Sequence, residues 1–211
     1  MNKTRASTAK LYVVAAPSGG GKTSLINALL EKDERVTLSV SFTTRSPRPG
    51  EKDGVHYHFV DDWEFARLIG QHAFLEHAEV YGHCYGTARD QVQNKLEAGF
   101  DVLLDIDWQG ARQLRESFPS CCTIFILPPS LEVLRNRLSR RGQDSEEVID
   151  LRMMEARAEI SHWNEFEHLI INDNFDEALA DLQSIVRHGS PLRLDCADRY
   201  DDLLAELLEN G

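Results

Sequence analysis

The segment that most constrains the fold is residues 11–30, which read LYVVAAPSGGGKTSLINALL. Residues 11–16 form an apolar run typical of a buried parallel strand. Beyond a glycine-rich loop, apolar side chains recur at helical spacing, at Leu25, Ile26, Leu29 and Leu30. A strand, a glycine-rich loop and a helix in this order predict a phosphate-binding loop.

The loop residues favour a nucleoside triphosphate. Gly19, Gly20 and Gly21 allow backbone N–H groups to turn inward around phosphate oxygens, and the helix N-terminus adds partial positive charge. Lys22 can reach the outer phosphates, and the Thr23 hydroxyl can join a magnesium shell. The pattern has glycine where this chain has Ala16, and a methyl group is tolerated there if φ stays negative. A glycine-rich hairpin or an ordinary strand–helix turn is the alternative.

Composition limits the class of protein. The 211 residues, 42% of them hydrophobic, fit one α/β domain or a core with a small inserted subdomain. The net charge of −12 argues against non-specific nucleic-acid binding, and no apolar run approaches membrane-spanning length. The cysteines lack CxxC spacing, so we expect free thiols and a cytoplasmic location. Residues 1–10 lack the apolar region of a signal peptide and are expected to be a disordered tail.

Further apolar runs predict strands at residues 36–40, 102–106, 123–127 and 169–171. Helical patterns separate them, at residues 88–98, 109–118 and 130–141, closed by Gly99, Pro119 and Gly142. Strands that alternate with helices predict a parallel sheet with right-handed crossovers.

Residues 41–87 break this rhythm with prolines, glycines, the alternating VHYHFV and a helix-like DDWEFARLI. The alternation predicts a half-exposed strand of an antiparallel sheet. We therefore expect an inserted small subdomain on the C-terminal side of the main sheet, where a bound ligand would face the phosphate loop.

Two arginines in this insertion indicate a phosphate ligand. Arg45 and Arg48 stand three residues apart in SFTTRSPRPG, and prolines stiffen the turn between them. Paired guanidinium groups of this kind bind phosphate bidentately. Tyr57, between His56 and His58, would point its phenol at that phosphate if it lies in a strand. A solvated surface turn is the alternative for the arginines, and a metal site is the alternative for the histidines.

Glu76 is the candidate residue for recognition of a base. It lies between apolar neighbours in FLEHAE, which suggests a partly buried strand. A buried carboxylate needs hydrogen-bond donors, and guanine offers two adjacent ones whereas adenine does not. Tyr85 adds a phenol and Thr87 adds a hydroxyl in the segment YGHCYGT. An ordinary surface glutamate is the alternative.

Two further motifs suggest magnesium binding and a lid. The strand LLDID ends in Asp105 and Asp107, which has the form of the second magnesium-binding motif of phosphate-loop enzymes, with both carboxylates expected on one side of the strand. Asp107 fits a helix N-cap equally well. Arginines gather near the end of the helix at 130–141 and beyond it, at Arg135, Arg137, Arg140, Arg141, Arg152 and Arg157. They suit a mobile lid over a triphosphate, or a solvated helix face.

Together these motifs resemble the guanylate kinase family from about residue 11 to residue 188. The quoted segments are APSGGGKT, SFTTRSPRPGE, GVHYHFV, FLEHAEVYGHCYGT, LLDIDWQGA and RNRLSRRG. The resemblance implies a phosphate-loop NTPase-type, three-layer α/β core with a parallel sheet, an inserted mixed-sheet subdomain that binds a nucleoside monophosphate, and a helical lid that bears arginines. The implied divisions are a domain at 11–189, a core at 11–40 and 88–189 with a lid at about 137–157, a GMP-binding subdomain at 41–87, and a C-terminal helix at 190–211.

The resemblance also implies roles for individual residues. ATP would be held by Pro17, Ser18, Gly19, Gly20, Gly21, Lys22, Thr23, Ser24, Asn172 and Asp173. GMP would be held by Ser41, Arg45, Arg48, Tyr57, Glu76, Tyr85, Thr87 and Asp107. Mg²⁺ would be bound by Thr23, Asp105 and Asp107, and the catalytic cations would be Lys22, Arg48, Arg137, Arg141 and Arg152. The implied reaction is the transfer of the γ-phosphoryl group of MgATP to GMP.

Two other functions remain open to such a sequence. Guanylate-kinase-like domains of scaffold proteins resemble this fold and bind phosphorylated peptides, but they typically lose parts of the loop that Lys22 and Thr23 complete here. A kinase of another small acceptor would use the same loop. The apolar stripe of residues 200–208 in an acidic C-terminal helix would pack on its own core or, as a hypothesis, join two subunits.

Overall fold

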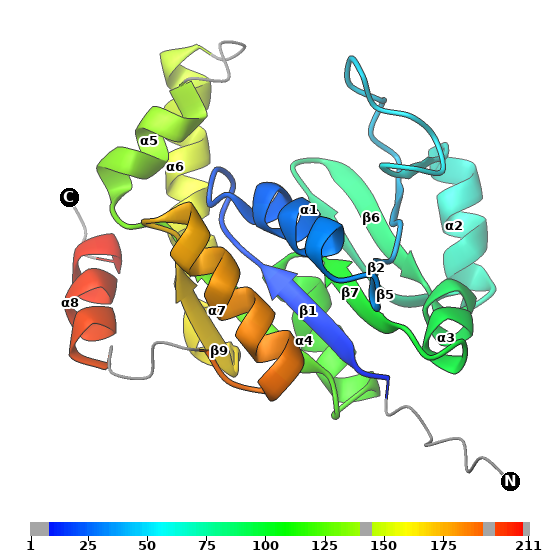
Figure 1. Ribbon diagram of the computed structural model, residues 1–211. Helices are drawn as coiled ribbons and strands as arrows, with labels where there is room; N and C mark the ends of the chain where they lie inside the picture. Colours follow the sequence, from blue (N-terminus) through cyan, green and yellow to red (C-terminus); the bar gives the residue numbers. More distant parts are fainter. Residues whose placement is uncertain (1–8, 140–144, 192–196, 209–211) are drawn as a thin grey trace, which may run out of the picture. The chain divides into compact units, whose positions relative to one another are not determined.

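The computed structural model describes residues 9–139, 145–191 and 197–208 (Figure 1). The chain divides into two compact units, one of residues 1–13 and 33–122 and one of residues 14–32 and 123–211. A five-stranded sheet has the order β2-β7-β1-β8-β9, and β1, Leu11–Ala15, contributes residues to both units. The predicted α/β fold is confirmed, because β2 pairs with β7 and β8 with β9 in parallel and a second, mixed sheet is present.

The first unit holds one edge of the main sheet and the whole of the small sheet. Its main-sheet strands are β2, Val36–Leu38, and β7, Asp101–Asp105. The small sheet has the order β4-β3-β6-β5, with β3 at Phe42–Thr43, β4 at His58–Phe59, β5 at Phe74–Val80 and β6 at His83–Ala88. Its helices are α2, Asp62–Gly70, α3, Arg89–Glu97, and α4, Trp108–Ser117.

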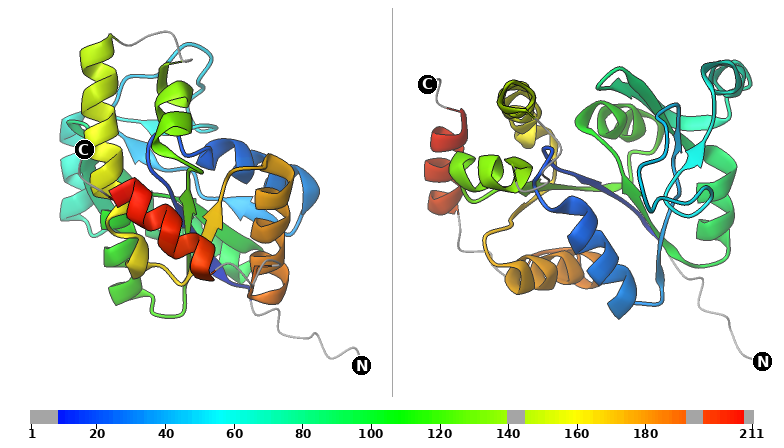
Figure 2. Two further views of the ribbon diagram at one scale, coloured as in Figure 1. Left: turned by 90° about the vertical axis from the view of Figure 1, so that its left-hand side faces the viewer. Right: turned by 90° about the horizontal axis from the view of Figure 1, so that it is seen from above.

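The second unit carries the remaining strands and most of the helices. Its elements are α1, Lys22–Lys32, β8, Cys122–Leu127, α5, Leu131–Ser139, α6, Glu146–Ile160, a short 3₁₀ helix at Trp163–Glu165, β9, His168–Ile171, α7, Phe175–His188, and α8, Ala197–Leu208. Helices α1 and α7 lie side by side on one face of the strands of this unit (Figure 2). The strands and helices expected outside residues 41–87 are therefore present, and the ends of the strands are shifted by at most two residues. Helix α8 begins at Ala197 and not at residue 190, and the expected end of the helix at 130–141 lies outside the described residues.

Helix α7 shows how local sequence sets these boundaries. The Asn174 side chain accepts hydrogen bonds from the backbone N–H groups of Asp176 (3.0 Å) and Glu177 (3.2 Å), which satisfies donors that the first turn leaves unpaired. The two acidic side chains suit the positive end of the helix dipole. The helix ends at Gly189, whose φ of 79° places it in the left-handed region that favours glycine.

The strand expected for VHYHFV is wrong in length and direction. Only His58 and Phe59 form a strand, and it pairs with β3 in parallel. The preceding residues use their backbone groups in local turns, since the Gly54 N–H donates to the Tyr57 carbonyl at 2.8 Å. The alternation of residue types therefore does not reflect a strand before residue 58, and Tyr57 lies just ahead of β4.

Strand β5 is an edge of the small sheet, and α4 pairs with part of that edge. The Gln113 side chain accepts from the His77 N–H at 3.1 Å and donates to the His77 carbonyl at 2.8 Å. The Gln109 amide donates to the Glu79 carbonyl at 3.4 Å. These bonds fix β5, which carries Glu76, against α4 and satisfy backbone groups that an edge strand would leave unpaired.

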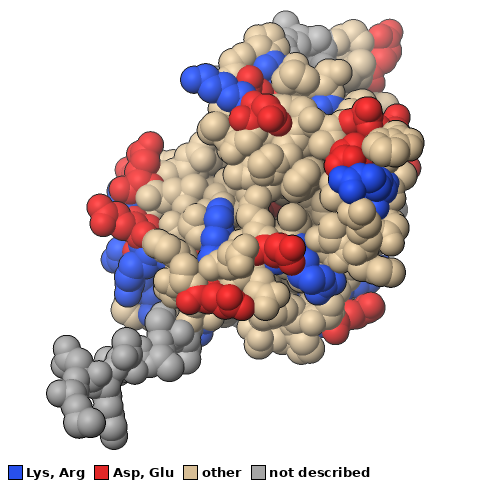
Figure 3. All heavy atoms as spheres, turned by 90° about the vertical axis from the view of Figure 1, so that its right-hand side faces the viewer, with Lys and Arg blue, Asp and Glu red and all other residues tan. Residues whose placement is uncertain are grey.

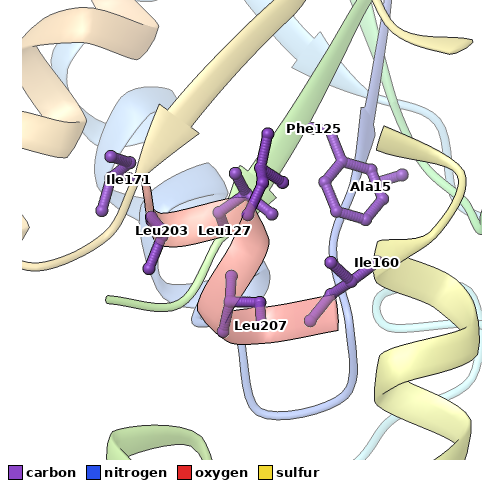
Figure 4. Close-up of a cluster of buried hydrophobic side chains, with 8 residues drawn as sticks. Ala15, Phe125, Leu127, Ile160, Ile171, Leu203 and Leu207 are labelled. Carbon is purple, nitrogen blue, oxygen red and sulfur yellow. The ribbon is translucent and has the colours of Figure 1, made fainter. Parts of the chain in front are cut away.

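The apolar stripe of α8 packs within its own chain. Leu203, Leu204 and Leu207 are buried in a cluster with residues of β1, β8, α6 and β9, namely Ala15, Phe125, Leu127, Ile160 and Ile171 (Figure 4). The Tyr200 hydroxyl donates to the Leu169 carbonyl at 2.9 Å. The first alternative, that the stripe packs on its own core, is therefore confirmed, and self-association through α8 stays an untested prediction.

The net charge and the length of the apolar runs can be compared with the surface and the helices of the structure. Acidic and basic side chains are intermingled on the face shown in Figure 3, where the described residues form no continuous basic area. None of the helices in the described part of the chain is long and apolar enough to cross a membrane.

We expect Leu207→Ala to lower the free energy of unfolding by about 2–5 kcal/mol, because it leaves a cavity in a packed cluster. Chemical denaturation measures this change, and Asp201→Ala, at an exposed position of the same helix, is the control. Light scattering should give an unchanged mass. A lower mass with unchanged stability would place the stripe at a subunit interface instead.

Candidate active site

The glycine-rich loop of the second unit has the backbone that phosphate binding requires. Gly19 and Gly21 have φ values of 86° and 92°, in the region that favours glycine, and the Gly20 N–H donates to the Pro17 carbonyl at 2.8 Å. Ala16 is not among the described residues with positive φ, so its methyl group is tolerated as expected.

Three other elements hold this loop. The Asn172 amide, just after β9, donates to the Gly20 carbonyl at 2.8 Å. The Glu159 carboxylate of α6 accepts from the Ser18 N–H at 3.1 Å. A Cβ atom added at Gly19 would lie 3.0 Å from Leu134 of α5, so the loop packs closely on that helix. The loop is therefore held by a bond to one of its carbonyls, by a bond from one of its N–H groups, and by packing.

Arg137 of α5 combines burial with an unpaired donor. Its Nη2 donates to the Asn172 carbonyl at 2.9 Å, whereas its buried Nη1 has no hydrogen-bond partner in the described part of the chain. Burial lowers the pKa of Arg137, and the nearby charge of Asp173 opposes that effect. A buried guanidinium N–H needs an acceptor, which makes Arg137 suited to an anionic ligand.

The other predicted residues of the donor site lie in the second unit as well. Lys22, Thr23 and Ser24 form the first turn of α1, and the Thr23 and Ser24 side chains are exposed. Asp173 is exposed beside Asn172, and Arg152 lies on α6. Helices α5 and α6 pack through Leu134, Leu138, Met153 and Ala156. Arg141 lies outside the described residues.

Glu76 is buried in the first unit, more fully than its sequence context indicated. Its exposed fraction is 3%, and its carboxylate accepts a short hydrogen bond from the Thr87 hydroxyl. Burial raises the pKa of Glu76 to about 7, with a further increase from the charge of Asp107, while the Thr87 hydroxyl opposes the change. Thr87 donates to Glu76 through its hydroxyl and its backbone N–H, and a carboxylate can accept more than two hydrogen bonds, so Glu76 is suited to a ligand that donates hydrogen bonds.

The small sheet places Glu76 near Thr87 and, further along β6, Tyr85, which belongs to a second group of polar side chains around Arg45. Glu76 is opposite Thr87 in the ladder between β5 and β6, and Ala78 is opposite Tyr85. Tyr85 and Thr87 alternate along β6 and so share one face, about 7 Å apart along the strand. Ser41, whose carbonyl accepts from the His58 N–H at 2.9 Å, is buried just before β3.

The second group gathers around Arg45. Its guanidinium lies 5.3 Å from the centre of the Tyr57 ring, and the Tyr57 and Tyr85 rings are 6.0 Å apart. The Arg45 side chain is 10% exposed and bonds to Glu51, whereas Arg48, on the adjacent turn, is exposed. The structure thus brings together Arg45, Tyr57 and Tyr85, as predicted, with Arg48 beside them in the chain.

Asp105 and Asp107 do not share one side of a strand, which corrects the expectation from alternation. Strand β7 ends at Asp105, and Asp107 is the N-cap of α4, where its carboxylate accepts from the Gly110 N–H at 2.9 Å. Asp107 also accepts from the Gln109 amide at 3.1 Å. The carboxylate oxygens of Asp105 and Asp107 are hard oxygen ligands of the kind that Mg²⁺ prefers. In the second unit, the exposed Thr23 hydroxyl is an oxygen ligand of the same kind.

The comparisons with known proteins agree on one family. Residues 8–189 match the family described as guanylate kinase. The guanylate kinase of Alkalilimnicola ehrlichii is 60% identical over 203 residues, 95% of this chain and 97% of that protein. That of Vibrio vulnificus is 55% identical over 200 residues, 94% and 97% of the two chains. The crystal structure of guanylate kinase from Anaplasma phagocytophilum has a TM-score of 0.72 at 33% identity and covers 97% of this chain and 98% of its own.

The chain belongs to the guanylate kinase family. The motifs that predicted a guanylate kinase are therefore explained, and three supporting residues of the guanylate kinase site were missed. A Cβ at Gly110 of α4 would collide with the Glu76 carboxylate, and a glycine inside a helix was the available signal. Glu159 bonds to the phosphate loop, and nothing in its local pattern distinguishes it from a surface glutamate. Glu51 bonds to Arg45, and the Arg-Pro-Gly-Glu turn that ends at Glu51 was the available signal.

We expect Asn172→Ala to lower the free energy of unfolding by about 1–3 kcal/mol, because it leaves the buried Gly20 carbonyl without its donor. The same change should raise the KM for ATP more than the KM for the acceptor. Denaturation and steady-state kinetics measure the two effects. Asn136→Ala, at an exposed position of α5, is the control, and equal behaviour of the two variants would contradict the role of Asn172.

Proposed function

We propose that this protein transfers the γ-phosphoryl group of ATP to GMP and releases ADP and GDP. The observation that carries the proposal is the buried Glu76 carboxylate opposite Thr87, on the same small sheet as Arg45 and Tyr85. This arrangement offers an acceptor for a base at one position and cations and phenols for a phosphate at another. Membership of the guanylate kinase family supports the same reaction.

Glu76 selects guanine in this proposal. The N1–H and exocyclic amine of guanine donate to the carboxylate, with the hydroxyls of Ser41 and Thr87 and the carboxylate of Asp107 completing the base site. AMP presents an acceptor at N1 and would leave the desolvated carboxylate unpaired. A hydrogen-bond mismatch of this kind can discriminate by about 10⁴-fold.

The phosphate of GMP is bound by Arg45, Arg48, Tyr57 and Tyr85. ATP is bound by the phosphate loop, residues 17–24, with Asn172 and Asp173 near its base. Lys22 and the arginines at 137, 141 and 152 stabilise charge on the transferring group, which is the largest contribution that such sites make. The reaction needs no covalent enzyme intermediate, because alignment of the acceptor phosphate with the γ-phosphoryl group suffices.

Magnesium enters this proposal as the partner of ATP. Thr23, Asp105 and Asp107 would hold Mg²⁺, which supplies charge stabilisation on the phosphates when bound. Closure of α5 and α6 as a lid would exclude water and prevent hydrolysis of ATP. We also propose a role in purine metabolism and a cytoplasmic location. Residues 11–189 are proposed to divide into a core, a lid and a GMP-binding subdomain at 41–87.

A screen of nucleoside monophosphates with ATP tests the function directly. A coupled assay of ADP release should give turnover with GMP and little with AMP, CMP or UMP. Binding of GMP without any turnover would favour a phosphopeptide-binding module instead. Turnover with another acceptor would identify a different small-molecule kinase.

We expect Glu76→Gln to lose the preference for GMP over AMP, because an amide can donate to the N1 of adenine as well as accept from guanine. The ratio of kcat/KM for the two nucleotides measures the effect. Glu79→Gln, an exposed position of the same strand, is the control. Unchanged selectivity in the Glu76 variant would defeat the guanine assignment.

The raised pKa of Glu76 predicts a pH dependence of GMP binding. GMP requires the ionised carboxylate, so the Kd for GMP should rise by about 10-fold for each pH unit below about 7, the pKa of Glu76. The GMP phosphate also titrates near pH 6. The Glu76→Gln variant retains that phosphate effect, so its profile should lack only the part due to Glu76. Identical profiles in calorimetric titrations would contradict this prediction.

Glu76 should affect the pH dependence of the free energy of unfolding in the opposite direction to an ion-paired carboxylate. The raised pKa of Glu76 means that the folded chain holds this proton more tightly than the unfolded chain does. The free energy of unfolding should therefore fall as the pH rises toward about 7 and then level off, as far as Glu76 is concerned.

A further inference from the structure

We propose that Glu51 is a positioning residue that holds Arg45 and the turn at Arg48 in place for the phosphate of the acceptor. The inference rests on the proposed function of these two arginines. Glu51 itself would not touch the substrate. Its carboxylate is bonded to the side chain of one arginine and to the backbone of the other.

The contact with Arg45 is bidentate. Nη1 of Arg45 donates to Oε2 of Glu51 at 3.0 Å, and Nη2 donates to Oε1 at 2.9 Å. Nη1 also donates to the Ser46 carbonyl at 2.7 Å. These bonds use the terminal edge of the guanidinium. The edge formed by Nε and the second Nη2 proton is the one that can offer two parallel bonds to a phosphate.

The contact with Arg48 is made through a turn that the sequence specifies. Residues 48–51 read Arg-Pro-Gly-Glu, and the Glu51 N–H donates to the Arg48 carbonyl at 3.0 Å. Proline at the second position and Gly50 with a φ of 87° at the third are typical of a type II turn. The Glu51 carboxylate closes the turn from the other side, because it accepts from the Arg48 N–H at 2.7 Å.

The ion pair between Arg45 and Glu51 is largely buried, which strengthens it. The side chains of Arg45 and Glu51 are 10% and 18% exposed, so their interaction is less screened than that of an exposed pair. Burial alone would raise the pKa of Glu51, but the hydrogen bonds from Arg45 and from the Arg48 backbone bring it below its ordinary value. Glu51 is therefore ionised near neutral pH and holds a long, otherwise flexible arginine in one conformation.

Titration of GMP and of guanosine in the absence of ATP tests the proposal, because guanosine lacks the phosphate. We expect Glu51→Gln to weaken GMP binding by about 10-fold to 100-fold and to leave guanosine binding and the KM for ATP unchanged. Glu51→Asp keeps the charge on a shorter side chain, so its affinity for GMP should lie between that of Glu51→Gln and that of the natural protein.

The matched control is Glu64→Gln. Glu64 also forms a bidentate pair, with Arg67 at 2.7 and 2.6 Å, but on the exposed surface of α2. That variant should bind GMP and guanosine normally. Equal weakening of GMP and guanosine by Glu51→Gln would show that Glu51 only supports the fold, and unchanged GMP binding would also overturn the proposal. If Glu51→Gln fails to fold, the same two comparisons are made with Glu51→Asp.

A parallel Arg45→Ala variant separates this proposal from the proposed function. If Arg45→Ala weakens GMP binding and Glu51→Gln does not, the positioning role of Glu51 is wrong and the phosphate site stands. If Arg45→Ala leaves GMP binding unchanged, the assignment of the arginine to the phosphate is wrong, and the role of Glu51 fails with it.

Discussion

The constraint on which the site depends is that polar groups for a ligand must keep hydrogen-bonding capacity for it while the chain is folded. The phosphate loop meets it because other elements bind its carbonyls and pack against it, as Asn172 does at Gly20 and Leu134 at Gly19. These contacts hold the loop in one conformation. Donors that are held in place need little reorganisation when charge develops on a phosphate.

At Glu76 the group kept for the ligand is an acceptor rather than a donor. Here an acceptor is buried beside Thr87, which donates to it, and burial raises the pKa of Glu76 to about 7. The carboxylate stays in place because α4 approaches closely at Gly110 and because the Gln113 side chain fixes the edge of β5. The unfavourable burial of this acceptor and the selectivity for a donor-bearing base therefore have one physical origin.

Much of the fold could be predicted from sequence, and the errors share a cause. The buried strands and the glycine-rich loop are local patterns, and the structure confirms them. The strand assigned to VHYHFV was wrong because local turns satisfy its backbone groups, and alternation alone does not reveal that. Strand β7 ends before Asp107, which is the N-cap of α4, so the alternative of an N-cap is the one that the structure confirms for Asp107. The sequence of α8 shows an apolar stripe but does not show what covers it, and the structure places that partner within the chain.

How easily a site can be recognised from sequence depends on how far apart its contacting residues are in the chain. Arg45 and Glu51 are six residues apart, and the Arg-Pro-Gly-Glu turn between them is legible in the sequence. Glu76 and Thr87 are 11 residues apart and meet only in the correct strand register. Asn172 and Gly20 are 152 residues apart, and no local pattern joins them. Ligand-contacting residues are recognisable because their chemistry is unusual, whereas the residues that hold them are ordinary polar side chains whose role is defined by a distant partner.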